Sequence, residues 1–163
     1  MKSIVICLFV LLCFGGVELR AASLVEEINA KVEGIDKRIK DGDFGILSVE
    51  QKIESEGAPP SFSFYYDRGT ERLIACEVSV GFETWSRQYF YYFDDNENVM
   101  KYLEVIPAST LGGPGPRREG MIFGKDEVLW TNLQQPPRQP PGTIKELYHG
   151  LMKASYSFSR WPQ

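Results

Sequence analysis

Two similar stretches occupy the middle of the chain: FYYDRGTERLIACEV at residues 64–78 and YYFDDNENVMKYLEV at residues 91–105. In each, aromatic residues lead into a polar turn that contains Asp, and an apolar run follows the turn. A fainter copy, MIFGKDEVLW, lies at residues 121–130. Aromatic and β-branched runs separated by short polar turns are typical of β-hairpins. The three copies therefore predict an antiparallel meander at the centre of the protein.

Residues 23–40 have the periodicity of an amphipathic helix. Apolar side chains recur there every three or four residues, with charged side chains between them. Ser23 followed by Glu26 forms a capping-box pattern, which predicts that the helix begins at Ser23. The strand expected at residues 88–93 is almost entirely aromatic, so both of its faces need cover. We therefore expect the helix to pack on one face of the sheet.

The segments around the meander predict a further strand and two loops. Residues 44–54 alternate partially between apolar and polar side chains, which favours the first strand over an extension of the preceding helix. Residues 107–118 and 135–142 are rich in proline, which cannot donate to a strand ladder, so both are predicted to be loops.

The C-terminal part of the chain predicts a short helix. Thr143 with Glu146 forms a second capping-box pattern, and apolar side chains follow at helical spacing. The aromatic tail, residues 156–163, is interpreted as a final strand. The predicted fold is thus α+β: an N-terminal amphipathic helix packed on an antiparallel meander sheet, with a short C-terminal helix, in a single domain over residues 22–163.

Residues 1–21 are interpreted as a signal peptide. Lys2 precedes an apolar run at residues 4–14, and the small residues Ala21 and Ala22 follow it. That run is far shorter than the roughly 20 residues that a membrane-spanning helix needs. We expect an exported protein, periplasmic or extracellular, with no integral membrane segment after removal of the signal.

A lipoprotein is the weaker alternative. Cys13 is the candidate for lipidation, but Leu12 precedes it, where lipoprotein signals have a small residue. Removal of residues 1–21 also takes away Cys7 and Cys13 and leaves Cys76, so we expect no disulfide within the mature chain.

Composition disfavours several classes of partner and cofactor. The formal net charge is −4, and the loss of Lys2, Glu18 and Arg20 with the signal peptide would make it −5. An acidic chain is a poor match for nucleic acid or anionic membranes, so no nucleic-acid partner is predicted. One histidine, His149, with Cys76 is too little for a zinc site of Cys and His. We predict no metal and no cofactor.

The acidic turn at residues 94–98 has oxygen ligands at alternate positions, as calcium loops do. Its spacing is wrong, because Val99 occupies the place of the required glycine and Val105 that of the bidentate glutamate. A hairpin turn is the better interpretation of these residues.

Aromatic and basic side chains outside the strands are candidates for contacts with a partner. Tryptophan, tyrosine and arginine are enriched in recognition surfaces. Some of them lie in the predicted connections, in the loops at residues 107–118 and 135–142, and in the tail. The candidate contact residues are Trp85, Arg117, Arg118, Arg138 and Trp161.

The runs Phe64-Tyr65-Tyr66-Asp67 and Tyr91-Tyr92-Phe93-Asp94, each followed by an apolar strand, give the chain a family resemblance. Over about residues 23–133 it resembles small uncharacterised exported bacterial α+β proteins, in which an N-terminal helix packs on strands of this pattern. The resemblance implies the α+β fold and an exported location. It implies no catalytic residues.

Two functions remain open, beside a structural envelope component that binds no ligand. The first is an exported, non-enzymatic binding or inhibitor-like module of the bacterial envelope that holds a protein or an envelope component. The second is a hydrolase of envelope polymers that uses a pair of carboxylates. Its candidate acids are Glu50, Glu54, Glu77, Asp94, Asp95 and Glu104. The shortage of catalytic side chains favours the first, so an enzyme is the less expected outcome.

Overall fold

The structure, a computed structural model, describes residues 22–50, 60–82, 85–106, 117–124, 128–133 and 141–159. Within these ranges a helix spans residues 22–40, seven strands follow, and α3 (Pro141–Ser159) is the C-terminal helix. The strands are β1 (Gly45–Glu50), β2 (Ser61–Tyr66), β3 (Leu73–Phe82), β4 (Trp85–Phe93), β5 (Val99–Ile106), β6 (Arg117–Phe123) and β7 (Val128–Thr131).

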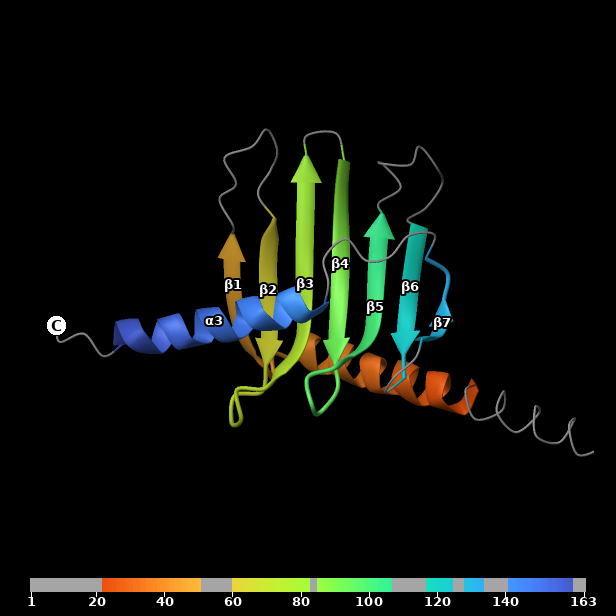
Figure 1. Ribbon diagram of the computed structural model, residues 1–163, viewed down its shortest axis with the longest axis horizontal. Coiled ribbons are helices and arrows are strands. Elements are labelled where there is room, and N and C mark those ends of the chain that lie inside the picture. The colour runs from red at the N-terminus through yellow and green to blue at the C-terminus, as the bar shows by residue number, and fades with distance from the viewer. Residues whose placement is uncertain are drawn as a thin grey trace, which may run out of the picture.

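The seven strands form one antiparallel sheet in the order of the sequence, from β1 to β7 (Figure 1). Strands that are consecutive in the chain are neighbours in the sheet, and β1 and β7 are its two edges. The predicted α+β fold with an antiparallel meander is confirmed.

The repeated aspartates build the turns of the two central hairpins. Each carboxylate accepts backbone N–H groups of the residues that follow it, which is how Asp stabilises a turn. The donors are Gly69 and Thr70 for Asp67, at 3.0 and 2.8 Å, and Asn96 and Asn98 for Asp94, each at 2.8 Å. The interpretation of residues 94–98 as a hairpin turn agrees with these contacts.

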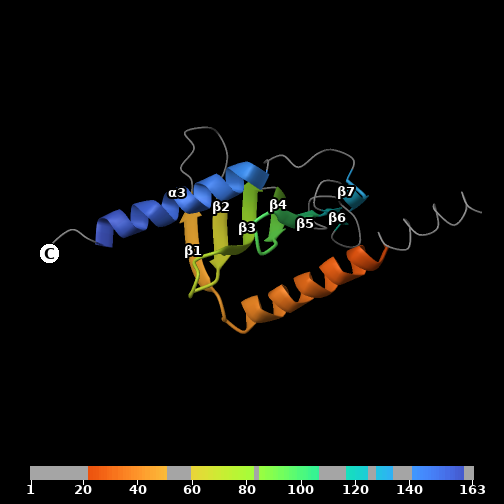
Figure 2. The ribbon, with the colours of Figure 1, turned by 60° about the horizontal axis from the view of Figure 1, so that its bottom comes forward.

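One helix lies on each face of the sheet, and both run across the strands (Figure 2). The helix at residues 22–40 covers β3 to β6 on one face, and α3 covers the other face nearer to β1. The buried residues of the first layer are Ile28, Val32, Ala75, Tyr92, Met100 and Ile122. Those of the second include Phe62, Phe64, Leu73, Val78, Tyr91, Tyr102, Ile144 and Tyr148.

Strand β4 explains why both layers are needed. Tyr92 faces the N-terminal helix, whereas Tyr89, Tyr91 and Phe93 belong to the core beneath α3. Burying large apolar side chains removes them from water and is the main favourable term in folding. The expectation that the N-terminal helix packs on the sheet is confirmed, and α3 supplies the second cover.

The C-terminal tail differs from its interpretation as a strand. Helix α3 continues to Ser159, so residues 156–159 are helical. No proline interrupts the sequence between Pro141 and Pro162, and extending an existing helix costs little once it has formed. Residues 160–163 lie outside the described part of the chain.

The starts of the helices also differ slightly from the capping-box predictions. Ser23 lies inside the N-terminal helix, which already includes residue 22. Helix α3 begins at Pro141, two residues before Thr143, in keeping with the tolerance of proline in the first helical turn. Strand β1 ends at Glu50, and residues 51–54 of the predicted strand lie outside the described ranges.

We predict that Gly120→Ala destabilises the sheet by about 1–3 kcal/mol, because a Cβ there would overpack a strand interior. It would lie 2.8 Å from Cδ2 of Leu103 and 2.9 Å from the backbone oxygen of Tyr102. Gly81 in β3 is the matched control, since a Cβ there meets nothing within 4 Å. Urea unfolding of both variants measures the difference, and equal effects at the two positions would contradict the prediction.

Candidate functional site

A groove of about 340 Å³ lies on the face of the sheet that the N-terminal helix covers, beside the last turn of that helix. Asp36, Ile39 and Lys40 of the helix form one wall. The sheet forms the floor, and its side chains there are mainly aromatic and aliphatic. The principal floor residues are Tyr65, Phe90, Leu103 and Val105.

The register of the strands explains why these side chains share one face. Residues directly opposite each other in an antiparallel pair project to the same side. Glu77 lies opposite Phe90, Phe90 opposite Leu103, and Leu103 opposite Gly120. One row across four strands therefore changes from acidic at β3, through apolar at β4 and β5, to glycine at β6.

Trp130 lies beside the β6 end of this row. A Cβ on Gly120 would be 3.5 Å from Cζ3 of Trp130, so the indole ring lies over the glycine. Trp130 pairs with Ile122 and is 43% exposed, although it is large and apolar. The apolar floor of the groove thus continues over Gly120 to an exposed tryptophan on β7.

Two cations stand at the groove without an ion pair. Lys40 ends the N-terminal helix, and Arg118 lies opposite Val105 on β6. Both side chains are exposed, and neither has a carboxylate partner in the part of the chain that the structure describes. The groove thus carries two cations, Lys40 and Arg118, and two acids, Asp36 and Glu77, and no ion pair joins them in the described residues.

The two acids of the groove are held by neighbouring donors. Tyr92 donates its hydroxyl hydrogen to Oδ1 of Asp36 at 2.9 Å. Ser79 and Gln88 each donate to Oε1 of Glu77 at 3.5 Å. Their lone pairs are thus partly occupied, whereas the cations keep their donors free for a ligand.

Only part of the predicted set of contact residues can be placed. Arg118 lines the groove. Trp85 begins β4 and Arg117 begins β6, so neither is in a loop, and their side chains are not described. Arg138 and Trp161 lie outside the described residues.

Sequence reasoning missed Trp130 as a surface residue. It belongs to the faint third copy of the aromatic pattern, which predicted a strand there and no contact residue. The feature that explains the exposure of Trp130 is its position on β7, a strand of four residues at the edge of the sheet. Edge strands have one unpaired side, and their side chains have fewer neighbours.

The described carboxylates among those proposed for hydrolysis do not face one another. Glu77 lines the groove on the face of the N-terminal helix. Glu104 lies opposite Tyr89 on the other face and forms an ion pair with Arg87 at 2.9 Å. The sheet therefore separates these two acids.

The remaining candidate acids are also engaged or apart. Asp94 holds its own turn, and Asp95 forms an exposed ion pair with Arg72 at 2.8 Å. Glu50 is exposed at the end of β1, and Glu54 lies outside the described residues. No two of the described candidates form a pair across a cleft.

Cys76 behaves as a core residue. It is buried in the layer beneath α3, as its position in the alternation predicted. Burial raises the pKa of its thiol well above the usual value, and the nearby Glu77 charge acts in the same direction. Since the thiolate is the reactive form, this thiol is a poor nucleophile.

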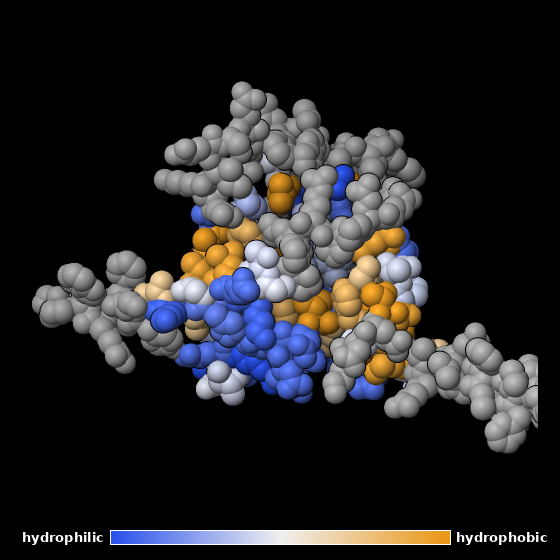
Figure 3. Space-filling model, in the orientation of Figure 1, coloured by the Kyte–Doolittle hydropathy of each residue, from blue (hydrophilic) through white to orange (hydrophobic). Residues whose placement is uncertain are grey.

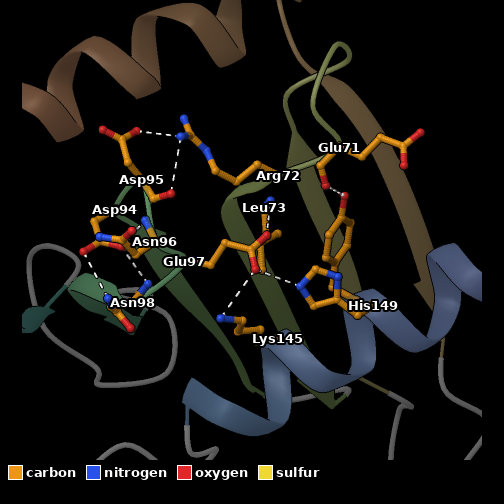
Figure 4. Close-up of polar contacts among 11 residues, drawn as sticks. Glu71, Arg72, Leu73, Asp94, Asp95, Asn96, Glu97, Asn98, Lys145 and His149 are labelled. Atoms are coloured by element: carbon orange, nitrogen blue, oxygen red, sulfur yellow. Dashed lines mark hydrogen bonds and ion pairs between the residues drawn. The ribbon is translucent and has the colours of Figure 1, made fainter.

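Glu97 forms a polar cluster that fastens α3 to the sheet (Figure 4). Its Oε1 accepts the backbone N–H of Leu73 at 2.9 Å, and its Oε2 contacts Nε2 of His149 at 2.8 Å and Nζ of Lys145 at 3.5 Å. The carboxylate therefore joins the β4–β5 turn, the start of β3 and α3. A paired histidine and carboxylate also occur in nucleophilic catalysis, but here the polar contacts of the pair serve the docking of the helix.

A second contact joins α3 to the neighbouring turn. The hydroxyl of Tyr148 donates to the backbone oxygen of Glu71 at 2.6 Å (Figure 4). Glu71 and Glu97 both have positive φ, at 58° and 57°, a conformation that side-chain-bearing residues rarely adopt. The two left-handed glutamates of the hairpin turns are thus the residues on which α3 is anchored.

No group of three or more His, Cys, Asp or Glu side chains that could hold a metal ion occurs among the described residues. Within the same ranges, no helix has the length and hydrophobicity required to cross a membrane. The chain matches no protein-family model, and no curated protein or solved structure is significantly similar to it.

We predict that Glu97→Gln lowers the free energy of unfolding at pH 7 by about 1–2 kcal/mol, since it weakens a half-buried, charge-assisted hydrogen-bond network whose histidine and lysine are partly exposed. Burial opposes ionisation of Glu97, but the Leu73 N–H, His149 and Lys145 outweigh it and hold its pKa below the usual 4.5. A depressed pKa gives stability that is present above about pH 4.5 and is lost as the pH falls through the folded-state pKa.

Urea unfolding of wild type and Glu97→Gln at pH 7 and at pH 3 measures this dependence. The difference should shrink at pH 3, because the carboxylate of the unfolded chain is protonated below about pH 4.5 and the stability from the lowered pKa is lost as the pH falls toward the folded-state pKa. Asp95→Asn is the control, because its ion pair with Arg72 is exposed and contributes little. A difference for Glu97→Gln that is as large at pH 3 as at pH 7 would show that the charge does not matter.

Proposed function

We propose that this protein is an exported, non-enzymatic binding module of the bacterial envelope. Its groove binds an apolar segment that has a negative charge next to it. The segment belongs to a protein or to another envelope component. Export and the bacterial source rest on the signal-like sequence of residues 1–21 and on the resemblance to small exported proteins.

The groove with its unpaired cations carries this proposal. A volume of about 340 Å³ is at the lower end of the range for ligand sites in proteins, roughly 300–1,000 Å³. Its floor is apolar, which favours an apolar occupant because binding removes apolar surface from water. Lys40 and Arg118 are exposed, whereas the acids Asp36 and Glu77 are half-buried, so the cations favour an anionic group next to that apolar part.

The side chains around the groove favour binding over hydrolysis. A carboxylate pair for hydrolysis must face a common substrate, with one acid in an apolar setting that raises its pKa. Glu77 is the acid of the groove floor, and Glu104 lies on the opposite face of the sheet. No observation among the described residues favours the hydrolase.

Anilinonaphthalene sulfonate is a suitable first probe, because it combines an apolar aromatic body with a negative charge. We predict saturable fluorescence enhancement by the native protein and at least about fivefold weaker binding by the double variant Lys40→Glu, Arg118→Glu, since two attractive charges become repulsive. Trp130→Ala should weaken binding about two- to tenfold, because it shortens the apolar floor.

Lys37→Glu is the matched control, since Lys37 is an exposed lysine of the same helix that does not line the groove. It should bind the dye within about twofold of wild type. Urea unfolding midpoints must stay equal across the variants, because the dye also binds partly folded states. Equal dye affinities of the control and the double variant would refute the groove as the binding site. An envelope component captured by wild type and Lys37→Glu, and lost by the double variant, would extend the result to the natural partner.

A further inference from the structure

We propose that two copies of this chain associate through β1, so that their sheets join into one continuous sheet around a two-fold axis. The occupant of the β1 edge is thus a second β1 strand that runs antiparallel to the first. This inference rests on the edge of the sheet and on α3, and it is independent of the ligand of the groove.

The described residues of the β1 edge lack most of the features that prevent strand pairing, and Glu50 is the one charged residue of the strand. Natural edge strands are blunted by proline, by lysine, by bulges or by shortness. The sequence of β1, GILSVE, contains neither proline nor a basic residue, and it pairs with β2 without a shift in register over its full length. Ile46 is 57% exposed on this strand.

The opposite edge is different. Strand β7 has four residues, and its pairing with β6 includes a register shift between Ile122 and Phe123. A short and irregular strand is a poor template for another chain. The comparison within one sheet therefore singles out β1 as the edge open to pairing.

Helix α3 extends beyond β1 on the same side. Figures 1 and 2 both show its C-terminal part passing the edge of the sheet. Tyr148 packs on Phe64 and Tyr66 of β2, and the helix continues to Ser159, which is roughly 16 Å farther along its axis. Strand β1 lies about 5 Å beyond β2, so roughly two further strands fit beneath the end of the helix.

A second copy would supply those strands. Its β1 and β2 would lie beneath the overhanging end of α3, and its own α3 would extend over the first copy. The outer surface of α3 is hydrophilic, and apolar surface appears beside it on the same side of the molecule (Figure 3). The two helices would thus cover apolar surface near the junction while they keep a polar outer face.

The symmetry restricts the register. A two-fold axis normal to the sheet keeps every side chain on its own face, and directly opposite residues must share a face. Each residue of β1 can therefore pair with itself or with a residue an even number of positions away. Centring the axis on Leu47 or on Ser48 gives the longest overlaps, and both place Ser48 and Glu50 of the two copies on one face at the junction.

The same symmetry places both grooves on one face of the joined sheet, opposite the two α3 helices. Two identical sites that face the same way can engage a repetitive partner together, which raises the overall affinity without any new contact. Pairing would thus suit a protein that holds an extended envelope component.

Charge substitutions at Ser48 test the junction, because Ser48 is exposed in the single copy. Ser48→Glu would gather four carboxylates at the junction with Glu50, whereas Ser48→Lys would give two cations and two carboxylates. Sedimentation equilibrium should show a wild-type dimer with a dissociation constant of order 1–100 μM, since the contact is of the small, transient class. The constant should rise at least about tenfold for Ser48→Glu and stay within about threefold for Ser48→Lys.

Val128→Glu on β7 is the matched control, because Val128 is a 49% exposed residue of the other edge strand. It should leave the dimer unchanged, and urea midpoints of all variants should agree, so that a folding defect is recognised. A monomer at all concentrations up to about 300 μM would overturn the proposal, since even weak specific contacts are populated there. A wild-type dimer that Ser48→Glu leaves intact would overturn it as well, because association would then use another surface.

Discussion

The lack of a polar face on the central strand β4 constrains the whole structure. A strand that is aromatic on both sides must be covered on both sides, because each exposed aromatic face would leave a large apolar area in water. One sheet with one helix would leave Tyr91 or Tyr92 exposed. The chain meets this requirement with a helix before the sheet and a helix after it, and each helix buries one face.

The second cover has to be held in place at the correct position on the sheet. The turns do this, since Glu71 and Glu97 adopt left-handed conformations that present a carbonyl to Tyr148 and a carboxylate to His149. Left-handed backbone costs free energy for residues with side chains, of order 1 kcal/mol or more. The contacts with α3 offset that cost, so the turns and the helix stabilise each other.

Much of the architecture was predictable because its signals are local. The repeated aromatic and Asp-containing pattern predicts the hairpins, and the spacing of apolar residues at 23–40 predicts the helix. The end of α3 was not predictable from residues 156–159, because their aromatic side chains fit a strand or a helix and only the preceding helix decides between them. Of the site, Arg118 was anticipated, but the groove depends on the register of five strands and on where the helix ends, which no local pattern contains.

The groove and the open β1 edge have one physical origin: the two helices cover the faces of the sheet only in part. A helix that crosses a seven-stranded sheet covers a band of it, and two helices of these lengths cannot cover both faces completely. On one face the N-terminal helix ends at Lys40, and the apolar floor beyond its last turn becomes the groove. On the other face α3 is displaced toward β1 and extends past it, which leaves helix without sheet beneath it. Apolar surface without cover favours an added partner in both places: a ligand where the surface is concave, and a second sheet where the surface ends in an unpaired strand.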